Sequence, residues 1–153
     1  MEKTFYIESF PYEIELTARI CHENAKRLLE TLTNEISLEE FSILDTIIAR
    51  PGLSQADLAR LVLKGKAHTG RFIMSLEEKG FVERHVKERD GKLIKIAVVT
   101  ESGKNLYDNI VGKMKPVIDQ YESMISEVDI DKMIQGLRDF REKIEKINKI
   151  VFE

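Results

Sequence analysis

The feature that most constrains this sequence is a change of hydrophobic period at Gly80. Residues 81–87 and 93–99 are β-branched runs that partly alternate between apolar and polar side chains, which is typical of β-strands. Asp90 and Gly91 lie between the two runs, and an Asp-Gly pair favours a tight hairpin turn because both residues tolerate positive φ. The sequence therefore predicts a two-stranded ribbon, and Arg89 and Lys92 make its tip basic.

Three short helical segments precede this ribbon, at about residues 37–50, 54–63 and 66–79. The first two begin at a serine that is followed three residues later by an acidic residue, a pattern typical of helix N-termini. The third ends at Gly80, as a helix with a C-terminal glycine cap does. Helix, turn, helix and β-hairpin is the order of a winged helix-turn-helix, in which a recognition helix enters the DNA major groove and the hairpin contacts the backbone or minor groove.

Longer amphipathic helices are predicted on both sides of this middle segment. One covers residues 13–33 and is entered after Pro11, and a second opens at Thr100, where Pro116 is expected to kink or divide it. A last helix begins at about Asp129 and carries a long apolar stripe, which a partner subunit would bury. The stripe consists of Met133, Ile134, Leu137, Phe140, Ile144, Ile147 and Val151. The predicted fold class is mainly α with a small β-hairpin wing.

The charge of the chain is unevenly distributed. Its 153 residues carry 24 Lys and Arg against 27 Asp and Glu, a net charge of −3, which by itself disfavours a nucleic-acid partner. Residues 60–104, however, hold 11 of the basic and only 6 of the acidic residues, a local net charge of +5. This asymmetry indicates a localised contact with a polyanion, and a solvated, charge-rich face is the simpler alternative.

Composition excludes several classes of protein. The single cysteine rules out a disulfide framework and fits a reducing compartment, so we expect a cytoplasmic protein. No apolar run reaches the roughly 18 residues of a membrane span, and no membrane association is expected. We find no phosphate-binding glycine loop, nucleophile elbow or metal-ligand spacing, and therefore expect no enzymatic activity, metal or cofactor.

Side chains that could contact DNA lie on the second and third short helices and on the ribbon tip. Arginine pairs with guanine. Hydroxyl and imidazole side chains reach base edges or phosphates, and a helix N-terminus offers free N–H groups to phosphate. The predicted contacts are Ser54, Gln55, Lys64, Lys66, His68, Thr69, Arg71, Arg89 and Lys92.

Three runs, at residues 54–61, 69–84 and 99–103, resemble the MarR family of transcriptional regulators. The resemblance includes a Leu-Glu-x-x-Gly-x-Val-x-Arg element from Leu76 to Arg84 and a Thr-x-x-Gly opening at Thr100. It implies one MarR-type subunit over residues 1–153, with a DNA-binding lobe at 36–100 and dimerisation helices at 12–34 and 101–151. It further implies a homodimeric repressor on a pseudo-palindromic operator, released by a small aromatic or phenolic effector.

The sequence departs from the family pattern at two places. The wing of the family usually carries an Asp-x-Arg or Asp-Arg-Arg element, and here either Arg89 or Lys92 takes that role. Gly70 replaces a hydroxyl-bearing residue of the recognition helix, where a glycine costs about 1 kcal/mol relative to alanine. Gly70 either allows a close approach of backbone to DNA or loosens the helix.

The family's effector pocket lies between the dimerisation helices and the DNA-binding lobe. Arg19, His22, Lys26 and Tyr107 could face it and receive an anionic aromatic ligand, although each is also an ordinary helix-surface group. An alternative is a thiol-based redox-sensing regulator in which Cys21 is the reactive residue. We expect Cys21 to be half-buried and unreactive. A winged-helix module for protein interaction, without a sequence-specific role on DNA, is the remaining alternative.

Overall fold

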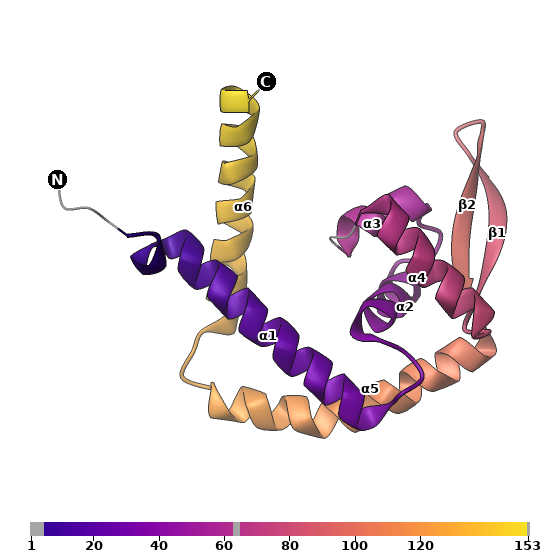
Figure 1. Cartoon of the computed structure of the whole chain (residues 1–153), viewed down its shortest axis with the longest axis horizontal. Coiled ribbons are helices and arrows are strands. Elements are labelled where there is room, and N and C mark those ends of the chain that lie inside the picture. The colour runs from indigo at the N-terminus through magenta and orange to yellow at the C-terminus, as the bar shows by residue number, and fades with distance from the viewer. Residues whose placement is uncertain (1–4, 63–64, 153) are drawn as a thin grey trace. The chain divides into compact units, whose positions relative to one another are not determined.

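The computed structural model describes residues 5–62 and 65–152 (Figure 1). The elements along the chain are η1 (Tyr6–Glu8), α1 (Phe10–Leu32), α2 (Leu38–Ala49), α3 (Gln55–Leu61), α4 (Lys66–Glu78), β1 (Val82–Arg89), β2 (Lys92–Val99), α5 (Glu101–Met124) and α6 (Ile130–Phe152). They form two compact units that meet in sequence between Lys115 and Pro116. The architecture is mainly helical with one antiparallel hairpin, which confirms the predicted fold class.

Helix α1 begins three residues before the predicted start. Ser9 is its N-cap and accepts a hydrogen bond from the backbone N–H of Tyr12. Pro11 lies in the first turn, where its missing N–H would have no helical partner in any case. The proline therefore belongs to the helix instead of preceding it.

Helices α2, α3 and α4 surround the core of the first unit, and α4 packs against both α2 and α3 beside the ribbon (Figure 1). Burial of this apolar surface is the main favourable term in the folding of the unit. Ser37 and Glu40 form the predicted capping box at the start of α2. The core residues are Leu29, Ile36, Ile43, Leu44, Ile47, Leu58, Ile73, Leu76, Phe81, Val82, Ala97 and Ile110.

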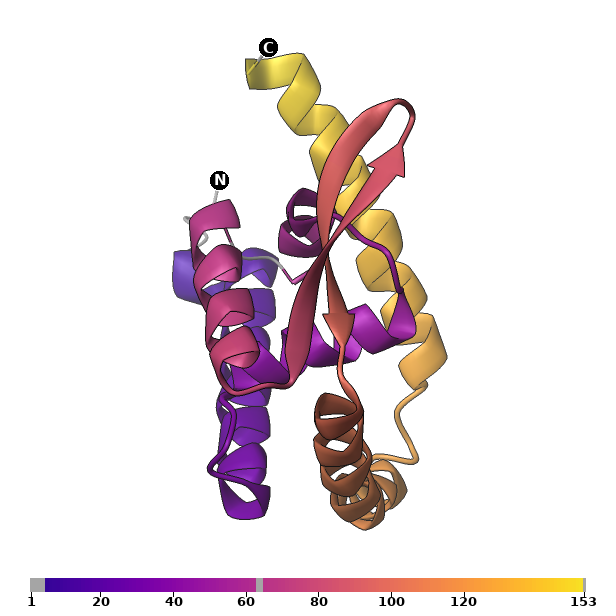
Figure 2. The same cartoon turned by 90° about the vertical axis from the view of Figure 1, so that its right-hand side faces the viewer.

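Strands β1 and β2 pair in antiparallel register from Val82 opposite Val99 to Arg89 opposite Lys92. Asp90 and Gly91 close the turn with φ values of 52° and 72°, the left-handed conformation that the Asp-Gly pair predicts. Figure 2 shows the twist of the ribbon. An isolated bridge between Ser54 and Ile96 attaches β2 to the chain just before α3.

Thr100 and Gly103 explain the Thr-x-x-Gly opening of α5. The Thr100 hydroxyl donates to the Gly80 carbonyl oxygen at 2.7 Å and accepts from the Gly103 N–H at 3.0 Å. A Cβ on Gly103 would collide with the carbonyl oxygen of Phe81, so only glycine permits this approach. The motif thus joins the end of the ribbon to the start of α5.

The second unit contains the last part of α5, from Pro116, together with α6. The expectation that Pro116 divides the helix is wrong, because α5 continues through it to Met124. On α6, Met133 and Ile147 expose 51% and 55% of their surface within the single chain. Among the described residues, no helix is long and apolar enough to cross a membrane.

Candidate nucleic-acid interface

Helix α4 separates exposed polar residues from a buried apolar face. Lys66, His68 and Arg71 are exposed, as predicted for a helix that enters a DNA groove. Ile73 and Leu76 are 2% and 0% exposed and hold the helix on the core. The first half of α4, from Lys66 to Arg71, therefore offers a basic, solvent-facing surface of the kind that contacts DNA.

The prediction that Thr69 lies on this exposed surface is wrong. Thr69 is fully buried, and its hydroxyl has no hydrogen-bond partner among the described residues. The reason is helical spacing: Thr69, Ile73 and Leu76 follow one another at i, i+4 and i+7 and share one face. The same spacing places Ala67, Arg71 and Met74 on another face, where all three are exposed.

Met74 is a residue of this surface that the sequence reasoning missed. It lies in the middle of the helix and is 49% exposed, although methionine is usually an interior residue. Its spacing from Ala67 and Arg71 was the available signal. An apolar side chain at this place suits contact with the methyl group of thymine.

Arg89 of the ribbon tip is tied to helix α3. Its Nη2 donates to Asp57 Oδ2 at 3.1 Å, and the Ser54 hydroxyl donates to the same oxygen at 2.7 Å. The hydrogen bond from Ser54, followed by that from Arg89, lowers the pKa of Asp57 below its ordinary value. Ser54 also caps α3 by accepting from the Asp57 N–H at 3.2 Å, so its hydroxyl already has partners within the protein. Lys92, across the turn from Arg89, is exposed.

Gln55 reaches from α3 to the recognition helix. Its Nε2 donates to the carbonyl oxygen of Lys66 at 3.3 Å, and the carboxamide lies over Gly70. Gln55 is a half-buried side chain, and this hydrogen bond orients its carboxamide toward α4. Lys64, also predicted to contact DNA, lies outside the described residues.

Glu40 anchors the other end of the recognition helix and was not predicted as part of this site. It is 4% exposed, and its carboxylate accepts from Lys79 Nζ at 2.8 Å on both oxygens and from Ser75 Oγ at 2.6 Å. Burial alone would raise the pKa of Glu40, but hydrogen bonds from Lys79, Ser75 and the Ser37 backbone outweigh it and lower the pKa. The carboxylate thus joins the N-terminus of α2 to the last turn of α4.

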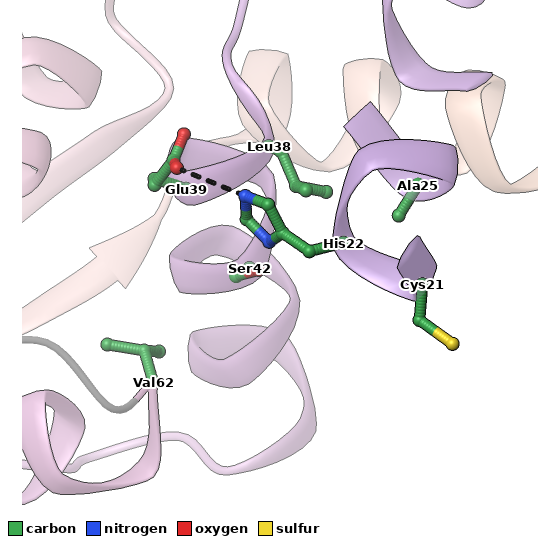
Figure 3. A pocket seen from close by; sticks show the side chains of 7 residues that line it. All are labelled: Cys21, His22, Ala25, Leu38, Glu39, Ser42 and Val62. Atoms are coloured by element: carbon green, nitrogen blue, oxygen red, sulfur yellow. Dashed lines mark ion pairs between the residues drawn. The ribbon is translucent and has the colours of Figure 1, made fainter. Parts of the chain in front are cut away.

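A cavity of about 500 Å³ lies between α1, α2 and the end of α3 (Figure 3). The His22 ring points toward Glu39, with 3.9 Å between Nε2 and Oε1. The Cys21 sulfur points away from this pair, and Cys21 is exposed instead of half-buried as predicted. The residues that line the cavity are Cys21, His22, Ala25, Leu38, Glu39, Ser42 and Val62.

The four predicted effector contacts do not converge on this cavity. His22 lines it, whereas Arg19 and Lys26 are exposed elsewhere on α1. The Tyr107 hydroxyl donates to Asp45 at 2.7 Å, and its ring stacks on Phe41 with centroids 5.7 Å apart. The hydrogen bond to Asp45, with burial, raises the pKa of Tyr107 to about 12.

No metal site accompanies this cavity. Among the described residues, no group of three or more His, Cys, Asp and Glu side chains is placed to hold a metal ion. Cys21 and His22 are adjacent on α1 and point in different directions (Figure 3). A structural metal site requires several ligands that converge on one point, which this pair does not provide.

Three short helices, the last of which has an exposed and basic N-terminal half, followed by a twisted hairpin, define a winged helix-turn-helix protein. Residues 36–94, which hold the three short helices and most of the hairpin, match the model of the MarR family. This finding confirms the resemblance based on the three sequence runs.

Solved structures of low sequence identity share the fold. The MepR–DNA complex of S. aureus is 18% identical, with a TM-score of 0.71 over 94% of this chain and 99% of that one. A MarR/EmrR family transcriptional regulator from Acinetobacter sp. ADP1 is 19% identical, with a TM-score of 0.72 over 89% and 94%. The transcriptional regulator BldR of Sulfolobus solfataricus is 20% identical, with a TM-score of 0.68 over 92% and 99%. No curated protein matches the chain.

Proposed function

We propose that this protein is a transcriptional regulator that binds a pseudo-palindromic DNA site as a homodimer and represses transcription there. The observation that carries the proposal is the exposed basic surface of α4, which lies opposite the face buried on the core. In this proposal α4 reads the major groove, and the β1–β2 ribbon contacts the backbone or the minor groove. The MepR structure in complex with DNA supports it by fold.

The homodimer is part of the proposal because α6 has more apolar surface than one chain buries. Ile134, Ile144 and Ile147 expose 41%, 38% and 55% of their surface along the helix. Contiguous apolar surface of this kind marks interfaces between proteins. A two-fold dimer would present two copies of α4 to two half-sites about 34 Å apart.

The proposal includes a small aromatic or phenolic effector in the cavity beside His22. The walls are largely apolar, with Ala25, Leu38 and Val62 beside the polar groups of His22 and Glu39. An uncharged phenol suits this cavity better than an anion, because the carboxylate of Glu39 would repel negative charge. The PcaV regulator of Streptomyces coelicolor has been solved with its natural ligand and shares the fold at a TM-score of 0.65 and 14% identity.

Binding to the DNA upstream of the chain's own gene tests the proposal, with a scrambled duplex as the reference. Fluorescence anisotropy at several salt concentrations should show tighter binding to the upstream DNA. The affinity should fall with salt because phosphate contacts release counterions. Equal affinity for both duplexes would contradict sequence-specific binding and would favour a protein-interaction module.

Lys92 provides the first variant of this test. Lys92→Ala should weaken binding to all sequences alike and reduce the salt slope by about one unit, because the residue contacts phosphate in the proposal. Lys113→Ala is the matched control, since Lys113 is an exposed lysine of α5 and not of the ribbon. Loss of affinity to the same extent in both variants would indicate a general effect of net charge.

A further inference from the structure

Helix α4 contains a glycine that its backbone geometry does not require. Gly70 lies inside the helix and is not among the described glycines with positive φ, so any residue could adopt its conformation. Alanine would favour the helix more strongly. The reason for glycine must therefore lie in what surrounds the position.

The surroundings of Gly70 consist of one side chain from another helix. A Cβ at position 70 would lie 2.7 Å from Nε2 of Gln55 and 3.6 Å from its Cδ. The missing side chain leaves room for the Gln55 carboxamide, which crosses α4 at this point and donates to the Lys66 carbonyl oxygen at 3.3 Å. Gly70 and Gln55 therefore form one structural unit that spans α3 and α4.

The Gln55 carboxamide keeps hydrogen-bonding capacity in this position. Its Oε1 has no hydrogen-bond partner among the described residues, and one N–H of the amide is used by Lys66. The residue is half-buried and lies beside the first turn of α4, next to exposed Lys66. A glutamine held in this way presents an acceptor and a donor, the groups with which Gln pairs with adenine in the major groove.

We propose that Gln55 of α3, held across Gly70 of the recognition helix α4, is a specificity-determining residue that selects among base pairs at one position of each half-site. The inference rests on the proposed function, because it needs a DNA site to read. In this account Gly70 is neither a loose point of the helix nor a place for close approach of DNA backbone. Its role is to leave the space in which the glutamine is oriented.

The test compares Gly70→Ala, Gln55→Ala and the double variant with the parent protein. Each is assayed on a site selected from random DNA and on duplexes that carry every single base change. Both single variants should lose discrimination by about tenfold at the same base pair, which is the worth of one side-chain pairing to a base. The double variant should lose no more than either single variant, because both changes remove the same contact.

Gly112→Ala is the matched control, because a Cβ on Gly112 of α5 would meet nothing within 4 Å. It adds the same helix-favouring methyl group without touching Gln55. The side-chain amide resonances of Gln55 should shift in Gly70→Ala and stay unchanged in Gly112→Ala. This NMR readout does not depend on DNA.

The outcomes separate the inference from the proposed function. Unchanged discrimination in Gly70→Ala, or weaker binding to all sequences alike, would overturn the inference while the parent still binds its site. A parent protein that selects no sequence would overturn the proposed function and the inference with it. Loss of discrimination at one shared base pair in both single variants, with no further loss in the double variant, supports the inference.

Discussion

At the scale of single residues, Glu40 links local helix capping to the position of the recognition helix. One oxygen accepts the Ser37 backbone N–H at 2.7 Å, which completes the capping box of α2. The same carboxylate binds Lys79 and Ser75 in the second half of α4. Because the carboxylate is 4% exposed, removal of its charge would leave Lys79 without its buried partner.

We predict that Glu40→Gln destabilises the protein by about 1–3 kcal/mol at pH 7, because a buried carboxylate loses charge-assisted hydrogen bonds from Ser75 and from Lys79, which is itself partly solvent-exposed. The pKa of Glu40 is lowered in the folded protein. The stabilisation that Glu40 contributes to the folded state is therefore complete above its pKa in the unfolded chain, near 4.5. This stabilisation is lost as the pH falls through the lower pKa of the folded protein. Urea denaturation from pH 7 down to pH 3 should show the difference between parent and variant shrink.

Glu78→Gln is the control for this measurement, since Glu78 is an exposed carboxylate of the same helix. It should change the free energy of unfolding by less than about 0.5 kcal/mol. An equal loss in both variants, or a difference that does not depend on pH, would contradict the role assigned to Glu40.

The sequence predicts the capping box of Ser37 and Glu40 but not the contact of Glu40 with Lys79. Ser37 and Glu40 are three residues apart, a spacing that itself indicates a capping box. Lys79 is 39 residues from Glu40, and Arg89 is 32 residues from Asp57, so no local pattern pairs them. These contacts depend on how the helices pack, which sequence spacing does not determine.

At the scale of elements, helix α4 contacts bases and the ribbon contacts phosphates in the proposed complex. Arg71 is exposed in the middle of α4, where a guanidinium can pair with guanine through two hydrogen bonds. Arg89 and Lys92 lie at the end of the ribbon, where cations contact phosphates without reading sequence. The ion pair between Arg89 and Asp57 connects the two elements through α3.

Arg71→Ala should cost about 1–3 kcal/mol of binding free energy on the selected site and relax the sequence preference at one position. Competition binding with single-base variants of the site measures both effects. Lys66→Ala is the comparison on the same helix, and it should weaken binding with less change in preference. Arg71→Ala binding as tightly and as selectively as the parent would contradict the role of α4.

Local sequence patterns predict the order and type of the helices and strands. The length of α5 and the buried face of α4 depend on tertiary packing. The Asp90-Gly91 turn and the two-stranded ribbon around it agree with the prediction, because turn geometry is encoded locally. Pro116 was overestimated as a break, since α5 continues past it. The polar character of Thr69 predicts an exposed side chain, whereas its helical spacing from Ile73 and Leu76 puts it on the buried face.

At the scale of the whole molecule, the net charge of −3 conceals a functional asymmetry. The exposed cations of α4 and the ribbon belong to the basic middle of the sequence, and the acidic excess lies before and after it. The acidic parts of the chain repel DNA, so net attraction is expected only when the basic surface faces the DNA. Affinity for unrelated sequences should therefore be low.

The dimer is tested at the apolar stripe of α6. Ile147→Glu places a charge where the proposed interface is dry, so it should convert dimers to monomers in sedimentation experiments. Arg138→Glu is the control, because Arg138 is an exposed residue of α6 that helical spacing places off the stripe. A monomeric parent, or dissociation of both variants alike, would contradict the assignment of this helix.

Selection of bound sites from a pool of random duplexes tests the central claim most directly. A homodimer with one recognition helix per subunit should enrich an inverted repeat whose half-site centres are about 10 base pairs apart, because they lie on successive major grooves. Repeating the selection with neutral phenols present should reduce recovery of the same site. Recovery of unenriched random sequence, or of one half-site without its inverted partner, would contradict the account.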